Sequence, residues 1–256
     1  MVGKLAGLSP DVKVILFRQW IFSLGVEKLD NIVRSNGKSM TLHISNVTRL
    51  LREFHATLET WVAGALHDIE EGYIAEHPHV TRARVKAKLR VWLHEIGEQM
   101  VNQAADFGEN SAEEMFERFS DNFITEVLTM IEAVTEPVKS DVSGNWLERK
   151  STYISQVAEG NENVALLSCA TKIDALMNVV QLLHDKSEAS ISEYANWSSG
   201  TTGYNIWLFE ELLLIYHSKN IDPNAIQIYE HYLTVFKELA EEIFADHPDE
   251  LNSPDN

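Results

Sequence analysis

Apolar residues recur at every third or fourth position along most of this chain. The stretches 58–69, 116–131 and 164–180 show the spacing most clearly. This is the period of one face of an α-helix, whereas a half-buried strand alternates strictly between apolar and polar residues, and such alternation is nearly absent here. The pattern therefore predicts an all-α protein.

Capping residues help to place the limits of the predicted helices. Asp222 before Pro223 marks the start of the last helix, because aspartate accepts hydrogen bonds from a first turn and proline fits within it. Ser111 and Glu114 have the spacing of a capping box. The predicted helices cover residues 9–25, 27–34, 43–56, 58–74, 80–104, 111–134, 144–158, 162–185, 203–219 and 222–245.

Length and charge limit the partners of the protein. The 256 residues are 45% hydrophobic, which is enough for one substantial core, so we expect a single domain over residues 1–250 and a disordered tail over 251–256. The formal net charge is −18, from 39 acidic and 21 basic residues. Because contacts to nucleic-acid phosphates need clustered Lys and Arg, this balance argues against nucleic acid and against an anionic membrane as general partners.

The single cysteine and the apolar runs indicate the compartment. Cys169 cannot form an intrachain disulfide, which fits a reducing compartment. It lies within an apolar helical pattern and is interpreted as a buried small residue rather than a nucleophile. We find no signal-peptide core near the N-terminus and no apolar run that reaches the length of a membrane span. We therefore expect a soluble, cytoplasmic protein.

The candidate chemistry lies in an ordered set of metal-ligand types. His43 precedes the dipeptide His67–Asp68 by 24 residues, and Asp174 follows far downstream. Two imidazoles and two carboxylates suit Mn²⁺, Fe²⁺, Co²⁺ or Zn²⁺. Four protein ligands on an ion with room for five or six leave positions for water and a phosphate oxygen, as metal-assisted hydrolysis of a phosphoester requires. Asp174 also needs a partner on physical grounds, because an unpaired carboxylate within an apolar helix is costly.

Two further polar residues lie one helical turn from members of this set. Residues four positions apart share a helix face, so Glu71 is expected beside His67, where its carboxylate can act as general base on a metal-bound water. Asn178 stands in the same relation to Asp174, and its amide can bond a ribose or phosphate oxygen.

The ordered segments of the chain resemble the HD-domain hydrolases of the RelA/SpoT type, which include the small alarmone hydrolases. Ala65–Glu71 is similar to the family's A-L-L-H-D-x-x-E-D, and His43 corresponds to its first histidine. The other similar segments are Phe116–Glu136, matching a helix that runs to V-x-x-V-T, Leu147–Lys150, matching a basic R-K stretch, and Lys172–Asn178, matching K-L-A-D-R-L-x-N.

The resemblance implies a fold and a role for each residue. Family members remove the 3′-pyrophosphate from (p)ppGpp or related nucleotides with Mn²⁺, on an HD-domain helical bundle. The implied ligands are His43, His67, Asp68 and Asp174, with Glu71 acting on the attacking water. Asn178 and Tyr204 would face the nucleotide, Arg149 and Lys150 would neutralise phosphate charge, and Lys38, with Arg34, is nearest to the basic pair that precedes the first histidine.

The chain also departs from the family pattern. Gly72 stands where the family has a second acidic residue, and Ile44 replaces the proline after the first histidine. Residues from about 73 to 110 intervene where the family has a short connection. We therefore expect an inserted helix near the mouth of the site, and additional C-terminal helices.

These observations predict a metal-dependent hydrolase that removes pyrophosphate from a guanosine or adenosine alarmone. Mn²⁺ is the metal that the resemblance implies, with Fe²⁺, Co²⁺ or Zn²⁺ as alternatives. A phosphohydrolase for another nucleotide and a catalytically impaired metal- or nucleotide-binding sensor stay open as interpretations. The expected partner is a small anionic nucleotide, with no nucleic acid and no membrane, and a homo-oligomer stays open.

Overall fold

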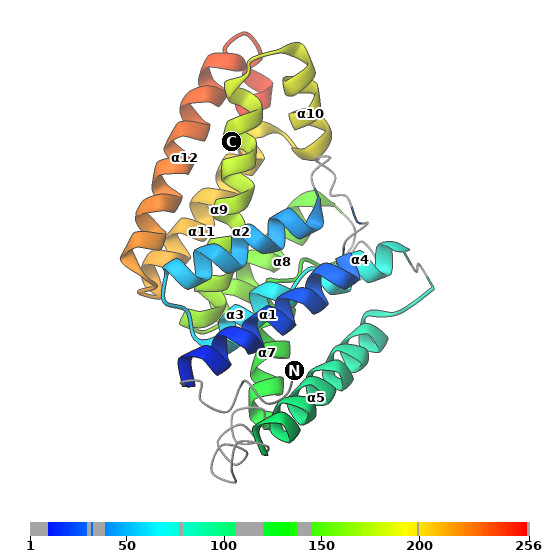
Figure 1. Cartoon of the computed structure of the whole chain (residues 1–256). Coiled ribbons are helices and arrows are strands. Elements are labelled where there is room, and N and C mark those ends of the chain that lie inside the picture. Colours follow the sequence, from blue (N-terminus) through cyan, green and yellow to red (C-terminus); the bar gives the residue numbers. More distant parts are fainter. Residues whose placement is uncertain are drawn as a thin grey trace.

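The computed structural model describes residues 10–29, 32, 39–76, 79–105, 120–137, 145–198 and 200–254. Within these ranges the regular structure is helical and contains no strand, so the all-α prediction is confirmed (Figure 1). The elements are α1 (Pro10–Leu29), α2 (Met40–Glu53), α3 (Leu58–Leu66), α4 (Ile69–Glu76), α5 (Arg82–Ala105), α7 (Asp121–Val134), α8 (Trp146–Glu159), α9 (Glu162–His184), α10 (Glu188–Ser198), α11 (Thr202–Ser218), α12 (Pro223–Ile243) and the 3-10 helix η2 (Pro248–Leu251).

Helix α9 is the central element of the fold. It packs against α2, α3, α7, α8, α10, α11 and α12. By length and composition alone α9 is apolar enough to cross a membrane, contrary to the expectation from the sequence, but 61% of its apolar window is buried inside the protein, as in a core helix. Cys169 lies within it and is fully buried, as predicted, and burial raises the pKa of its thiol well above the ordinary value.

Helices α2 and α3 approach each other closely on one side of α9. At Gly64 a Cβ would lie 2.4 Å from Leu51 Cδ1 and 3.4 Å from Leu167 Cδ1, so a larger residue would require the Leu51 side chain to move. The close packing brings the histidine of α2 next to the histidine that ends α3.

The structure differs from the predicted helices at particular places. The helix predicted over 58–74 is divided by a turn at His67–Asp68 into α3 and α4. Helix α10 was not predicted, and α1 continues to Leu29, beyond the predicted end of the first helix. The Asp222 cap is confirmed, since its carboxylate accepts hydrogen bonds from the first turn of α12, whereas the capping box at Ser111 lies outside the described residues.

The segment expected to add a helix contains α5, which packs on α4 and α7 at the periphery of the fold (Figure 1). Its first residue anchors it, because Arg82 Nε lies 3.0 Å from Glu70 Oε1 and Arg82 Nη2 donates to the Glu136 carbonyl at 2.6 Å. Near the other end of the chain, the predicted tail begins with packed residues: Leu251 lies against the core, and Asn252 O accepts a hydrogen bond from Thr201 Oγ1 at 3.2 Å.

Candidate metal centre

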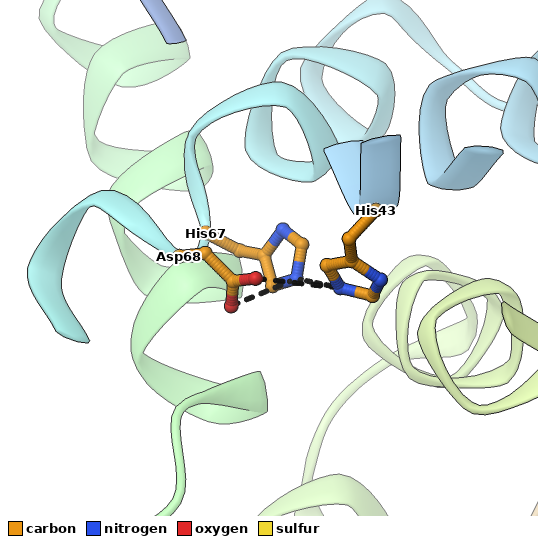
Figure 2. Close-up of side chains that lie close together, drawn as sticks. All are labelled: His43, His67 and Asp68. Carbon is orange, nitrogen blue, oxygen red and sulfur yellow. Dashed lines mark hydrogen bonds and ion pairs between the residues drawn. The ribbon is translucent and has the colours of Figure 1, made fainter. Parts of the chain in front are cut away.

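Three side chains from two elements converge in one buried place (Figure 2). His43 projects from α2, and His67 and Asp68 come from the turn between α3 and α4. The Nε2 atoms of the histidines lie 3.2 Å apart, and the Asp68 carboxylate lies 3.4 Å from His43 Nε2 and 3.2 Å from His67 Nε2. The exposed fractions are 4% for His43, 6% for His67 and 8% for Asp68. This group could hold a metal ion.

In each imidazole the outer nitrogen, Nδ1, forms a hydrogen bond that determines whether the inner nitrogen, Nε2, carries a hydrogen. His67 Nδ1 lies 2.9 Å from the Gly64 carbonyl, and His43 Nδ1 lies 2.6 Å from Asp174 Oδ2. Since a carbonyl and a carboxylate only accept, both Nδ1 atoms carry the hydrogen. In the neutral rings both Nε2 atoms therefore present lone pairs, and they do so toward each other and toward Asp68. Such an arrangement of acceptors is stabilised by a shared cation.

The spacing of these atoms also suits a metal. Zinc-like bonds to histidine nitrogen and carboxylate oxygen are about 2.0–2.2 Å long, and right or tetrahedral angles between them place the ligand atoms roughly 3.0–3.5 Å apart. The 3.2 Å between the two Nε2 atoms falls in that range. So do the 3.4 Å from His43 Nε2 to Asp68 Oδ2 and the 3.2 Å from His67 Nε2 to Asp68 Oδ1, which are different oxygens of the carboxylate. Three protein ligands in a buried site leave positions for water and substrate.

Asp174 lies behind His43 and is not part of this group of three. Its Oδ2 bonds His43 Nδ1 and accepts from Asn178 Nδ2 at 3.1 Å, while its Oδ1 accepts from Asn46 Nδ2 at 2.6 Å. A carboxylate that holds the outer nitrogen of a ligating histidine fixes the tautomer and ring orientation. Asn178 lies one turn after Asp174 and donates to it, while its predicted contact with the substrate and the role of Asp174 as a direct ligand stay predictions.

Local sequence explains why these side chains point inward. The Ser39 hydroxyl accepts a hydrogen bond from Thr41 N and so starts α2, whose buried face carries His43 together with Ile44 and Val47. Helix α3 ends at His67, and the backbone turns there before α4 begins. His67 keeps αR backbone angles at this turn, and the side chains of His67 and Asp68 both approach His43 Nε2.

A pocket opens beside Asp174, with a volume of about 480 Å³. Its polar lining includes the amides of Asn46, Asn178 and Gln181, together with His184 and Tyr232. Sequence reasoning identified Asn178 and missed the others. Asn46 follows His43 by three residues and so lies on the same side of α2, which is a signal that the sequence offered.

Two of the predicted residues cannot be placed in this site. Lys38 lies outside the described residues. Glu71 is a residue of helix α4, but the structure describes only its backbone and not its side chain. Their assigned roles stay predictions.

The predicted phosphate-neutralising residues are engaged with an acidic partner. Lys150 forms an ion pair with Glu136, and Lys172 Nζ lies 3.8 Å from the same carboxylate. Burial opposes ionisation of Glu136, but the ammonium groups keep the pKa of its carboxyl below the ordinary value, and Arg149 adds to this effect. Burial in turn lowers the pKa of Lys150. Tyr204 packs on Trp146, with ring centroids 5.6 Å apart, and does not line the pocket beside Asp174.

Gly72, which replaces the second acidic residue of the resembled family, has a packing role. A Cβ at this position would lie 2.5 Å from Leu29 Cδ2 and 2.6 Å from Ile32 Cδ1. The space of a side chain at 72 is therefore filled by apolar residues from the end of α1 and beyond it. Glycine is the residue that this contact between α1 and α4 accommodates.

Comparison with known proteins gives no family assignment. No protein-family profile matches the chain, and no curated protein sequence matches it. A solved structure that it resembles is the 1.85 Å crystal structure of lmo0812 from Listeria monocytogenes EGD-e. The TM-score is 0.47 and the identity 23%, over 77% of this chain and 97% of that one, and this level of similarity carries no argument about function.

Proposed function

We propose that this protein is a metal-dependent phosphohydrolase of the HD type. The observation that carries the proposal is the convergence of His43 Nε2, His67 Nε2 and the Asp68 carboxylate, each presenting lone pairs, in one buried place. Mixed imidazole and carboxylate donors at these separations suit Mn²⁺, Fe²⁺, Co²⁺ or Zn²⁺.

The ion would supply an activated water near neutral pH and would stabilise the charge of the reacting phosphoryl group. The residues of the chain prepare this chemistry. Asp174 and the Gly64 carbonyl hold the two imidazoles in the ligating tautomer. Glu71 is assigned the general base because the sequence places it one turn after the dipeptide. Glu71→Gln is expected to keep the metal bound and to slow turnover by roughly 10²–10⁴-fold.

The pocket beside Asp174 supports a nucleotide as substrate. Its lining combines side-chain amides with the apolar surface of Tyr232 and Met177, and such a mixture suits the base and the ribose of a nucleotide. Together with the sequence resemblance, this favours removal of pyrophosphate from a guanosine or adenosine alarmone. A small substrate at a locally cationic centre is also compatible with the net charge of −18.

Two other functions each have an observation in their favour. Lys150 pairs with Glu136, whereas hydrolysis of an alarmone was expected to use this lysine to neutralise phosphate charge. This pairing favours another nucleotide as substrate. Apolar side chains occupy the space beside Gly72 where the family pattern has an acidic residue, which favours a sensor that binds metal and nucleotide without turnover.

A panel of nucleotides separates these functions. Purified protein with Mn²⁺ is given (p)ppGpp, its adenosine counterpart and ordinary nucleoside triphosphates, and the products are identified by chromatography. Pyrophosphate release that is lost in Asp68→Asn, and kept in the control Glu241→Gln on the exposed side of α12, supports the alarmone hydrolase. Unchanged release in Asp68→Asn contradicts the metal centre, and metal binding without any turnover identifies the sensor.

A further inference from the structure

A second pocket, lined by arginines, lies between α1 and α2 on a different side of the molecule. Its volume is about 310 Å³. Its cationic lining is Arg18 from α1 with Arg49 and Arg52 from α2, and Trp61 of α3 contributes an aromatic wall. The gathering of three arginines is notable because acidic residues outnumber basic ones 39 to 21 in the chain.

Two of the three arginines have no carboxylate partner in the described part of the chain. Among the described residues, neither Arg18 nor Arg52 forms an ion pair with a carboxylate. The Nε of Arg18 is buried without a hydrogen-bond acceptor, although its guanidinium lies 5.4 Å from the centroid of the Trp61 ring. Arg49 pairs with Glu53 at 2.8 Å, but both side chains are well exposed, and such a pair contributes little.

The arginines also repel each other. Burial lowers the pKa of Arg18, and the charge of Arg52 lowers it further. An unpartnered guanidinium that is partly removed from water and placed beside another cation is an unfavourable arrangement, and a bound anion relieves it. Arginine is the residue best suited to such an anion, because its planar fork binds phosphate oxygens in a bidentate manner.

We propose that this pocket binds a small phosphate ester, with Arg18 and Arg52 holding the phosphate and Trp61 and Phe22 lying along the organic part. The volume fits a small molecule. The hydroxyl of Ser45 and the amide of Gln19, which also line the pocket, add neutral polar groups. The strongly negative charge of the chain disfavours an anionic membrane as the source of the phosphate.

The pocket is distinct from the metal centre. Both use α2, but at 100° per residue Ser45, Arg49 and Arg52 lie on the face of the helix opposite to His43. Helix α2 therefore separates a ligand in this pocket from the metal centre. The inference does not depend on the proposed hydrolase activity.

Phenyl phosphate, which joins a phosphate to an apolar ring, is the probe for this site. It is titrated into metal-free protein in a buffer of low ionic strength, and affinity is measured by calorimetry. The indole N–H of Trp61, which donates to Thr48 O at 3.0 Å in the pocket wall, provides a local signal by ¹⁵N NMR, assigned with Trp61→Phe. The variants are Arg18→Gln, Arg52→Gln and His67→Ala, with Arg90→Gln on α5 as the control arginine.

The proposal predicts saturable binding that shifts the Trp61 signal and weakens at least about tenfold in Arg18→Gln and in Arg52→Gln. Affinity in His67→Ala and Arg90→Gln is expected to match that of the wild type. Because Arg52 is exposed, its variant tests the site even if Arg18→Gln disturbs the packing of α1. Binding that is absent at millimolar phenyl phosphate, that is unchanged in Arg52→Gln, or that disappears in His67→Ala would overturn the proposal.

Discussion

Asp174 bonds the outer nitrogen of His43 at 2.6 Å, and thereby directs the inner nitrogen of that ring toward His67 and Asp68. The carboxylate is itself fixed by the side-chain amides of Asn46 and Asn178. A histidine from one helix is thus held by a carboxylate from another, 131 residues away in sequence. The relationship makes the orientation of the metal-binding group depend on the packing of α2 against α9.

This geometry distinguishes two roles of Asp174. If it orients His43, Asp174→Asn should weaken metal binding by about 10–100-fold, the range found when an outer partner of a ligand is changed. If it is instead a direct ligand, as the sequence suggested, the loss should equal that in Asp68→Asn. Calorimetric titration of Mn²⁺ into the wild type and both variants measures the difference. Asn46→Ala, which removes a partner of Asp174 only, should produce a smaller loss than either.

Gly72 leads to a prediction about stability. Restoring the acidic residue of the resembled family with Gly72→Asp should destabilise the fold by roughly 1–3 kcal/mol, because the new side chain overlaps Leu29 and Ile32. Gly72→Ala should be destabilising as well, since the overlap begins at Cβ. Urea denaturation followed by circular dichroism gives the free energies of unfolding. A Gly72→Asp variant as stable as the wild type would show that this space is not filled.

Buried tyrosines predict how stability changes at alkaline pH. Burial raises the pKa of Tyr194 to about 12, and it raises those of Tyr153, Tyr216 and Tyr229 as well. Up to the unfolded-state pKa of about 10, tyrosine is protonated in both states and its contribution is complete. Between about 10 and 12 the unfolded chain loses protons that the folded one keeps, so stability falls, by about 1.4 kcal/mol per pH unit for each such tyrosine.

The measurement is an alkaline titration followed by both tyrosine absorbance and circular dichroism. The buried tyrosines should ionise together with the loss of helix rather than before it. Ionisation of all tyrosines with the helices intact would contradict the packing of this core.

Much of the fold could be predicted from the sequence, because apolar spacing records which helix faces are buried. The all-α class followed from this spacing. Helix α10 (Glu188–Ser198) escaped prediction although Ile191, Tyr194 and Ala195 have helical spacing, because its three serines resemble the composition of a loop. The break at His67–Asp68 was invisible for the opposite reason: apolar residues continue in helical register up to Ile69, and no glycine or proline marks the turn.

The candidate site shows the same limits. Residue type and order identified His43, His67 and Asp68, because two histidines and an aspartate in this order are recognisable as a set of metal ligands. Sequence order could not reveal whether Asp174 faces the group of three or the outer side of His43, since this depends on how two helices pack. The partner of Lys150 is Glu136, which follows α7, and the partner of Glu70 is Arg82 of α5; both pairs likewise follow from tertiary packing alone.

The central claim is that His43, His67 and Asp68 bind one metal ion. The most direct measurement is a crystal structure of the protein with Mn²⁺, recorded at the manganese absorption edge so that the ion is located by its anomalous signal. We expect a single peak between the two Nε2 atoms and Asp68, absent in His67→Ala and retained in His184→Ala, whose histidine lines the adjoining pocket. No peak in the wild type, with the two imidazoles bridged by a proton instead, would contradict it.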